Sequence, residues 1–169
     1  MRRFPWIPTV LTAAAIVVLV GLGVWQVQRL KWKEGLIAAA DAAAAKPPAP
    51  LDQVLREGDL EFRKALIVCP GLASAPFVEL QSIHDGQAGV RLISACRPMG
   101  QDFALLIDRG FVGDGVTARP RVIQTTLPLV LAGQFRTFPQ PGGLTPAPAN
   151  DRFYARDTAA MAKALHVVG

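Results

Sequence analysis

An uncharged run from Phe4 to Gln28 constrains this chain of 169 residues more than any other feature. Its stretch from Ile7 to Trp25 is almost wholly apolar, and an α-helix of that length would be ~28 Å long, close to the hydrocarbon thickness of a bilayer. Trp6 and Trp25 stand at its two ends, where aromatic side chains favour the boundary between water and lipid. The sequence therefore predicts a helix that spans a lipid bilayer.

The net charge of +5 belongs to the flanks of this helix. Residues 1–33 hold no acidic residue and five of the 18 basic residues: Arg2, Arg3, Arg29, Lys31 and Lys33. The rest of the chain has 13 basic and 13 acidic groups, without a basic cluster. A nucleic-acid-binding domain needs a basic patch to neutralise phosphates. The charge pattern therefore predicts that no nucleic acid is bound.

The N-terminal Arg-Arg followed by apolar residues also resembles a signal peptide. However, the apolar stretch is long for one, no small-x-small cleavage site follows it directly, and the Ala-rich patch at 42–45 lies too far beyond it. We therefore expect an uncleaved anchor at residues 1–33. Because basic residues stand at both ends, charge alone does not set the orientation of this anchor.

Cys69 and Cys96 are the only cysteines, and both follow the predicted anchor. A pair in the soluble part suits an oxidising compartment, which favours a bacterial inner-membrane protein with its domain in the periplasm. If they form a disulfide, they close a loop of about 27 residues, which would stabilise the fold by ~3–4 kcal/mol in the chain-entropy model. Two buried free thiols are the alternative, because cysteine is often simply a small core residue.

Residues 34–50 are predicted to be an Ala- and Pro-rich linker, in which the helix continues to Ala45 and a proline run then ends it. Residues 51–169 are predicted to form one domain. Short helices are expected at Leu51–Glu57 and, after Asp157 as N-cap, at Thr158–His166.

Between these helices, several short runs have the composition and partial alternation of strands. They are Leu60–Val68, Pro76–Ile83, Val90–Arg97, Phe103–Val112 and Leu127–Phe135. Strands this short with hairpin-length links indicate antiparallel pairing. The expected fold class is therefore α+β: an N-terminal transmembrane helix, then a mainly antiparallel, small barrel-like β domain with short helices.

The sequence offers few candidates for catalysis. His84 and His166 are far apart, and each has an ordinary structural explanation, in a turn closed by Gly86 and at a helix end. Neither cysteine has a nearby histidine that would indicate a nucleophile. We therefore predict no catalytic residue and no metal site, and we expect the protein not to be an enzyme.

The end of the predicted anchor offers a candidate binding face. At 100° per residue, one stripe about 100° wide contains five side chains, those of Gly21, Trp25, Gln28, Arg29 and Trp32. This stripe suits a partner membrane helix, or a porphyrin whose propionates meet the arginine. An ordinary interfacial girdle with a snorkelling arginine is the alternative.

Four stretches occur in an order that is itself informative. They are Gly-Leu-Gly-Val-Trp-Gln-Val-Gln-Arg-Leu-Lys-Trp-Lys at 21–33, Glu-Phe-Arg-Lys at 61–64, Leu-Leu-Ile-Asp-Arg-Gly-Phe-Val at 105–112 and Asn-Asp-Arg-Phe-Tyr-Ala-Arg-Asp at 150–157. In this order they resemble the first helix, the first strand, the V-N-R-G-W-V strand and the aromatic-Asp segment of the Surfeit locus protein 1 (Shy-type) family of cytochrome c oxidase assembly factors.

The resemblance implies a non-enzymatic factor that helps the largest subunit of a haem-copper oxidase, and its assembly intermediates, to mature. Haem a is implied as a cofactor that such a factor helps to insert. By the same resemblance, Arg109 and Gly110 maintain the domain, although Arg109 could instead face solvent beside Asp108. The residues that we expect to contact the partner or haem are Gly21, Trp25, Gln26, Arg29 and Trp32.

Family members have a second membrane helix after the domain, and this chain ends at Gly169 before one. The resemblance therefore leads us to expect a truncated or divergent member, and it gives neither His84 nor His166 a role in binding haem. A permanent accessory subunit or envelope scaffold, attached by the same anchor and without a haem role, is the alternative function.

Overall fold

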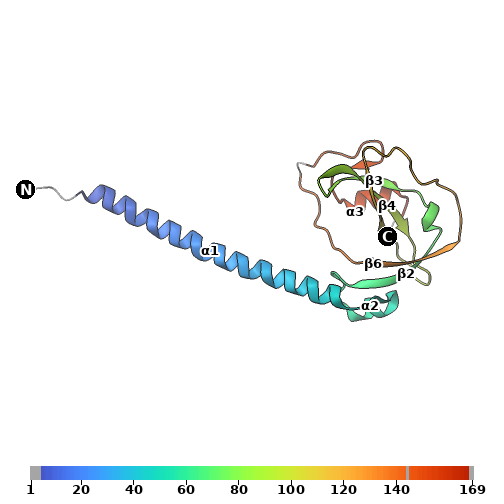
Figure 1. Ribbon diagram of the computed structural model, residues 1–169, viewed down its shortest axis with the longest axis horizontal. Helices are drawn as coiled ribbons and strands as arrows, with labels where there is room; N and C mark the ends of the chain where they lie inside the picture. The colour runs from blue at the N-terminus through green and yellow to red at the C-terminus, as the bar shows by residue number, and fades with distance from the viewer. Residues whose placement is uncertain (1–4, 144, 168–169) are drawn as a thin grey trace, which may run out of the picture. The chain divides into compact units, whose positions relative to one another are not determined.

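The computed structural model describes residues 5–143 and 145–167, so that Arg2 and Arg3 of the predicted anchor lie outside the described residues. The chain divides after Ala45 into two units, an N-terminal helix and a β-rich domain. The helix, α1, runs unbroken over Trp6–Ala45 (Figure 1). Among the described residues it is the one helix that is long and apolar enough to cross a membrane.

The domain contains two β-sheets and short helices. In chain order its elements are β1 (Ala49–Pro50), α2 (Leu51–Glu57), β2 (Lys64–Pro70), the 3-10 helix η1 (Leu72–Ser74), β3 (Val78–His84), β4 (Gln87–Cys96), β5 (Leu105–Gly113), β6 (Pro128–Gln134), β7 (Arg152–Phe153) and α3 (Thr158–Ala164). One sheet has the strand order β1-β2-β6 and the other the order β5-β4-β3-β7.

The α+β class predicted from the sequence is therefore correct, but the described strands form two sheets rather than a closed small barrel. Two long irregular connections separate β6 from the strands before and after it, one at residues 114–127 and the other, in its described part, at residues 135–143 and 145–151. Both connections contain prolines, which lack the N–H that a ladder requires. The chain thus changes sheets through loops and does not continue one ladder around a barrel.

The first strand and the start of the domain differ from their predicted positions. The strand expected at Leu60–Val68 runs over Lys64–Pro70, because the chain turns at Phe62, whose φ is 62°. The domain also begins before residue 51, since Ala49 pairs with β2 and is buried in the core. By contrast, α2 has the predicted bounds, with Gly58 after it at φ 79°.

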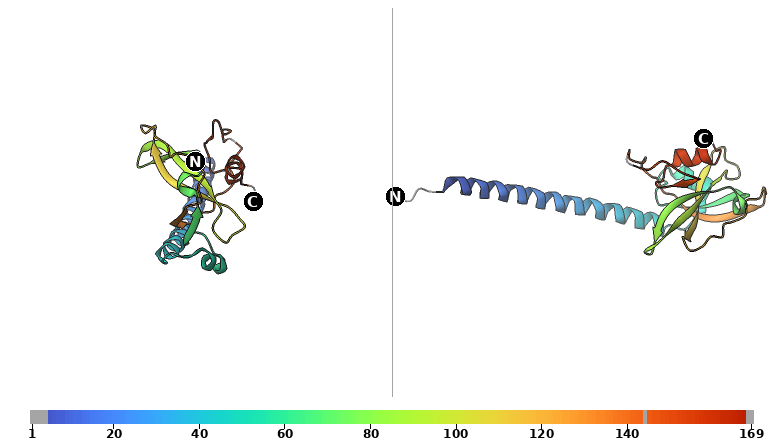
Figure 2. Two further views of the ribbon diagram at one scale, coloured as in Figure 1. Left: turned by 90° about the vertical axis from the view of Figure 1, so that its right-hand side faces the viewer. Right: turned by 90° about the horizontal axis from the view of Figure 1, so that it is seen from above.

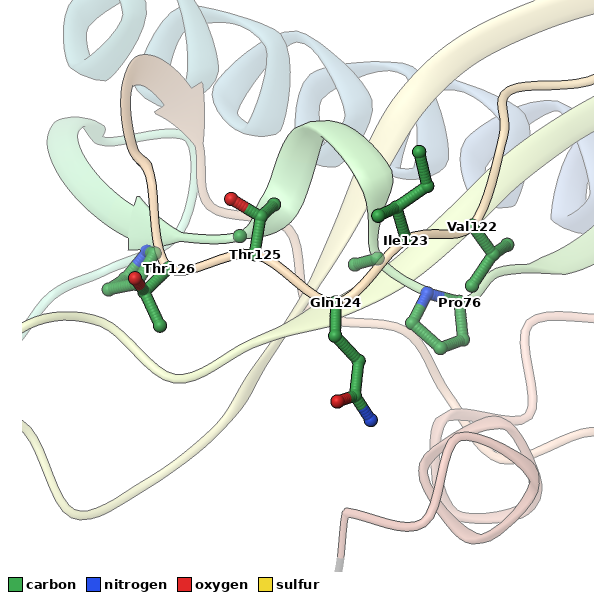
Figure 3. Close-up of a pocket in the computed structure, with 9 residues that line it drawn as sticks. Pro76, Val122, Ile123, Gln124, Thr125 and Thr126 are labelled. Carbon is green, nitrogen blue, oxygen red and sulfur yellow. The ribbon is translucent and has the colours of Figure 1, made fainter.

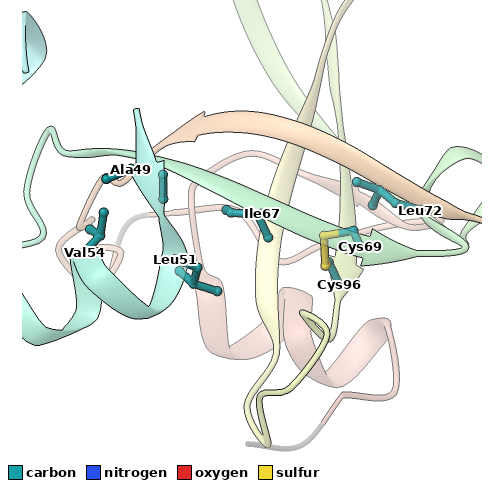
Figure 4. Packing of buried hydrophobic residues seen from close by; sticks show 8 residues of the cluster. Ala49, Leu51, Val54, Ile67, Cys69, Leu72 and Cys96 are labelled. Atoms are coloured by element: carbon teal, nitrogen blue, oxygen red, sulfur yellow. A yellow bond between two sulfur atoms is a disulfide. The ribbon is translucent and has the colours of Figure 1, made fainter. Parts of the chain in front are cut away.

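One core cluster packs α2 against β2 (Figure 4). Val54 of α2 and Ala65, Ile67 and Cys69 of β2 are among its buried members. The structure joins Cys69 to Cys96, the last residue of β4, in a disulfide with a Cα–Cα distance of 5.7 Å. This bond connects the three-stranded sheet to the four-stranded sheet.

A second cluster lies where α3 packs against the four-stranded sheet (Figure 2, right, with α3 in red). Met161 of α3 and Phe153 of β7 pack there with Val78 and Leu80 of β3. The predicted cap of α3 is confirmed, because an oxygen of the Asp157 carboxylate accepts a hydrogen bond of 2.9 Å from the N–H of Ala160. The cap fixes the start of the helix that covers this sheet.

Candidate functional site

The predicted docking face lies on α1, and the structure leaves it uncovered. No described residue of α1 is buried, and Trp25 and Trp32 are 50% and 61% exposed. A Cβ added to Gly21 would meet no atom within 4 Å. The guanidinium carbon of Arg29 lies 5.4 Å from the centroid of the Trp25 ring, so both belong to one face. Gln26 lies about 100° from Trp25 around the helix and therefore at the edge of this face.

Arg109 and Gly110 lie at a β-bulge between β5 and β4. Arg91 pairs with Phe111 and Ile93 with Asp108, so that two residues of β5 stand opposite the single Leu92. Gly110 has a φ of 119°, in the region that favours glycine, and its N–H donates a 3.0 Å hydrogen bond to the Asp108 carboxylate. The bulge turns the Arg109 side chain toward the connection between β2 and β3.

There the guanidinium of Arg109 binds three neutral oxygens. It donates to the carbonyl of Ala73 at 2.7 Å, and to the carbonyl of Ala75 and the hydroxyl of buried Ser94 at 3.3 Å each. Burial lowers the pKa of Arg109, although the side chain stays a cation at neutral pH. Arg109 thus ties β5 and β4 to η1. It does not simply face solvent beside Asp108, which pairs with Arg91 instead.

Arg63, the arginine of the second family-like stretch, is only 5% exposed and holds the start of the domain. Its guanidinium donates to both carboxylate oxygens of Glu57 at 2.8 and 3.0 Å, and to the carbonyl of Pro47 at 3.4 Å. This bidentate hydrogen bond raises the pKa of Arg63 and lowers the pKa of Glu57. Arg63 therefore fixes the end of α2 next to the chain that enters the domain.

Arg152, the arginine of the last stretch, attaches β7 to β3. It donates to one oxygen of Glu79 at 2.9 Å, while Arg119 donates to the other at 2.6 Å. Burial tends to raise the pKa of Glu79, but hydrogen bonds from the two arginines outweigh it, and the pKa is lowered. Sequence reasoning had selected Arg109 alone, although Arg63 and Arg152 occupy comparable positions in the quoted stretches.

A second uncovered surface lies on the domain, over residues 122–130. Gly71 donates its N–H to the carbonyl of Leu127 at 2.9 Å, and Ile123 donates to the carbonyl of Ser74 at 3.0 Å, so this segment is held along the connection between β2 and β3. It carries five apolar side chains that are 40–75% exposed: Val122, Ile123, Leu127, Leu129 and Val130. We call it the 122–130 surface. Sequence reasoning missed it, although the chain from Val122 to Phe135 carries no charge.

An open groove of about 560 Å³ adjoins the 122–130 surface. Figure 3 shows residues 122–126 along one side of it, with Ile123 and Gln124 pointing in different directions and Pro76 nearby. The residues that line the groove are apolar or uncharged, and none of them titrates near neutral pH. This arrangement suits the binding of an uncharged surface better than acid–base chemistry.

Neither histidine belongs to α1 or to the 122–130 surface. His84 is exposed at the end of β3, with a ring nitrogen 3.7 Å from the Asp85 carboxylate, and His166 ends the turn after α3. Within residues 5–143 and 145–167, no three His, Cys, Asp or Glu side chains come together as metal ligands would.

Comparison with known proteins finds relatives along most of the chain. The model of the SURF1 family matches residues 13–168. Surfeit locus protein 1 of Mus musculus is 28% identical over 162 residues, which cover 85% of this chain and 53% of the mouse protein. Cytochrome oxidase assembly protein SHY1 of Saccharomyces cerevisiae is 30% identical over 96 residues, which cover 55% of this chain and 25% of the yeast protein.

These alignments thus cover about half of the mouse protein and a quarter of the yeast protein. No solved structure matches the chain.

Proposed function

The chain belongs to the SURF1 family, and on that premise we propose that it is a membrane-anchored assembly factor for cytochrome c oxidase that assists the maturation of the largest subunit. The observation that carries this proposal is the family match over residues 13–168, which includes most of α1 and every strand and helix of the β-rich domain. The yeast relative is named as a cytochrome oxidase assembly protein.

The chemistry of the uncovered surfaces supports a factor that works by binding. The α1 face and the 122–130 surface present aromatic and aliphatic side chains, whereas several ionised groups of the domain form structural ion pairs such as Glu57–Arg63 and Glu79–Arg152. Exposed apolar surfaces of this kind mark contacts with proteins or membranes. We accordingly propose that the protein acts without catalysing a reaction.

We place α1 in the bacterial inner membrane and the domain in the periplasm. The length and hydropathy of α1 support the first part of this placement. The Cys69–Cys96 disulfide supports the second, because disulfides persist in oxidising compartments such as the periplasm.

Haem a fits the described part of the α1 face poorly. Arg29 offers a charge for a propionate, but Gly21, Trp25, Gln28 and Trp32 supply no imidazole, thiolate or thioether to bind the iron. We therefore assign this face to a protein partner, and we propose that any effect on haem a insertion acts through the oxidase subunit.

Deletion of the gene tests the proposed function. We expect the haem a content and the activity of the terminal oxidase to fall together, and expression of the full chain to restore both. The activity of another respiratory complex serves as the control. Normal haem a content and normal oxidase activity in the deletion strain would contradict the proposal.

Co-purification separates an assembly factor from a permanent subunit. The factor should be substoichiometric and bound to immature oxidase. A protein that stays at one copy per mature enzyme would instead be an accessory subunit.

A further inference from the structure

The α1 helix extends well beyond its apolar segment. From Lys31 to Ala45 it adds 15 residues, which at 1.5 Å per residue make about 22 Å of helix outside the lipid if α1 is the anchor proposed above. The proline run that follows ends the helix. A helix of this length between membrane and domain is exposed to water or to another protein.

The face that begins at Gly21 continues along this extension. At 100° per residue, Trp32, Leu36, Ala39 and Ala43 all lie within about 40° of the direction of Trp25. Trp32 and Leu36 are more than half exposed, and no described α1 residue is buried. Acyl chains can cover such side chains inside a bilayer, but beyond it the exposure of apolar side chains to water is unfavourable. The part of this face outside the lipid is therefore expected to be buried against another protein segment.

The charges of the extension avoid this face. Lys31, Lys33, Glu34 and Asp41 lie about 80° to 180° from the Trp25 direction. A helix with one uncharged face and one charged face packs its uncharged face against another element. Small side chains at Gly21, Ala39 and Ala43 allow a second helix backbone to approach closely.

Arg29 indicates what that second helix carries. It is the one charged residue within about 60° of the Trp25 direction over residues 21–43, and the contact that the described residues give it is the Trp25 ring. At the edge of a bilayer such a cation is stabilised by an anionic group at the same depth. Complementary charge therefore favours a carboxylate on the partner, level with Arg29.

We propose that the α1 face from Gly21 to Ala43 binds one membrane helix of a partner protein, which continues beyond the bilayer and carries an Asp or Glu opposite Arg29. With the proposed function, on which this identification alone rests, the partner is an oxidase subunit or one of its assembly intermediates. The 122–130 surface lies on the domain and is not part of this contact.

Photo-crosslinking in native membranes, with the full chain, tests the geometry. A photoreactive amino acid at position 36 should crosslink to one membrane protein, whereas the same group at position 34 or 41, on the charged side, should not. Crosslinks from position 36 only to a second copy, to lipid or to residues 46–167 of the same chain would overturn the proposal.

Two neighbouring substitutions provide a matched comparison. Ala39→Glu places a carboxylate within the face, whereas Ala38→Glu places it about 140° away. We expect Ala39→Glu to reduce the co-purified partner about tenfold or more, because an unpaired charge would be buried, and Ala38→Glu to leave it within about twofold. Equal losses in both variants would contradict the proposed face.

Charge exchange identifies the partner residue. Arg29→Glu should abolish the crosslink, and substitution of the facing carboxylate of the identified partner by Lys should restore it. Failure of every such exchange would overturn the proposed pairing. If the exchange succeeds with a membrane protein unrelated to the oxidase, the docking face is correct and the proposed function is wrong.

Discussion

In the domain, Arg63, Arg109 and Arg152 each hold separate parts of the chain together through carboxylates, carbonyls or a hydroxyl. On α1, Arg29 instead lies over the ring of Trp25, four residues before it on the same helix. All four arginines belong to stretches that resemble the same family. The fold accounts for the first three, but it gives Arg29 no partner from another element among the described residues.

This contrast indicates two different roles for the family-like stretches, stabilising the fold and binding a partner. A residue whose contacts connect distant parts of its own chain stabilises the fold, and its replacement should lower the free energy of unfolding. A residue that is exposed and makes only local contacts is better explained by an external partner. The domain motifs therefore point to the stability of this chain, and the α1 motif points to the molecule that it binds.

The largest expected effect comes from the second core cluster. Phe153 is 3% exposed and follows the Arg152 contact on β7, and the neighbouring Tyr154 is 46% exposed. Phe153→Ala should lower the free energy of unfolding by about 3–5 kcal/mol, because the lost side chain leaves a cavity. Tyr154→Ala should change it by less than about 0.5 kcal/mol. Denaturant unfolding of the full chain in detergent measures both, and similar losses would contradict the assigned core.

The disulfide comes next. Replacing Cys69 and Cys96 together by Ala should cost ~3–4 kcal/mol, because the unfolded chain then regains the freedom of a closed loop of 27 residues. The helix content of α1 should not change, since α1 lies outside that loop. Reductant should destabilise the unsubstituted protein but not the double variant. A stability that is insensitive to reductant in the unsubstituted protein would contradict a structural role for this bond.

Local patterns predicted local structure well. The bounds of α2, the cap by Asp157 and the antiparallel pairing of β4 with β5 follow from side-chain pattern, capping chemistry and short links, all of which are local in the sequence. The position of β2 was wrong by several residues, because the turn at Phe62 interrupts the alternation and only tertiary contacts reveal it. Its buried side chains are Ala65, Ile67 and Cys69.

Contacts between residues far apart in the chain could not be predicted from the sequence. Arg119 lies 40 residues from Glu79, and nothing in the spacing selects that pair. The spacing of the two cysteines likewise left a bridge and free thiols equally open. Resemblance identified Arg109 but not its acceptors at Ala73 and Ala75, which the bulge brings within reach. The 122–130 surface can be recognised in the sequence as part of a run without charge. Its exposure, however, depends on which elements cover the sheets.

A smaller effect is expected at Arg109. Arg109→Ala leaves the carbonyls of Ala73 and Ala75 and the hydroxyl of Ser94 without their donor, which should cost about 1–3 kcal/mol. Arg29→Ala on α1 should leave the unfolding of the domain unchanged while weakening partner capture.

Thermal or denaturant unfolding, with co-purification in parallel, therefore distinguishes the stabilising role of Arg109 from the partner-binding role of Arg29. Arg121→Ala, at an exposed position of the domain, is the control for loss of a positive charge. An Arg29 variant that unfolds the domain as readily as the Arg109 variant would remove the distinction between the two regions.

The smallest effect is a dependence of stability on pH through Glu79. Hydrogen bonds from Arg119 and Arg152 outweigh burial and lower its pKa in the folded domain, whereas the unfolded chain keeps the ordinary value of about 4.5. The unfolded state therefore binds a proton first as the pH falls. The stability that Glu79 contributes is fully present above the ordinary value and is lost as the pH falls through it toward the lower folded value.

Glu79→Gln removes this titration but retains much of the side-chain shape. The substituted protein should therefore be less stable near pH 7 and should lose less stability on acidification than the unsubstituted protein. Glu57→Gln should give a similar trend, because the pKa of Glu57 is lowered by Arg63. Glu34→Gln on α1 should leave the acid profile of the domain unchanged, since Glu34 belongs to the other unit. Parallel acid profiles for the unsubstituted and Glu79→Gln proteins would show that this ion pair does not couple β3 to β7 in solution.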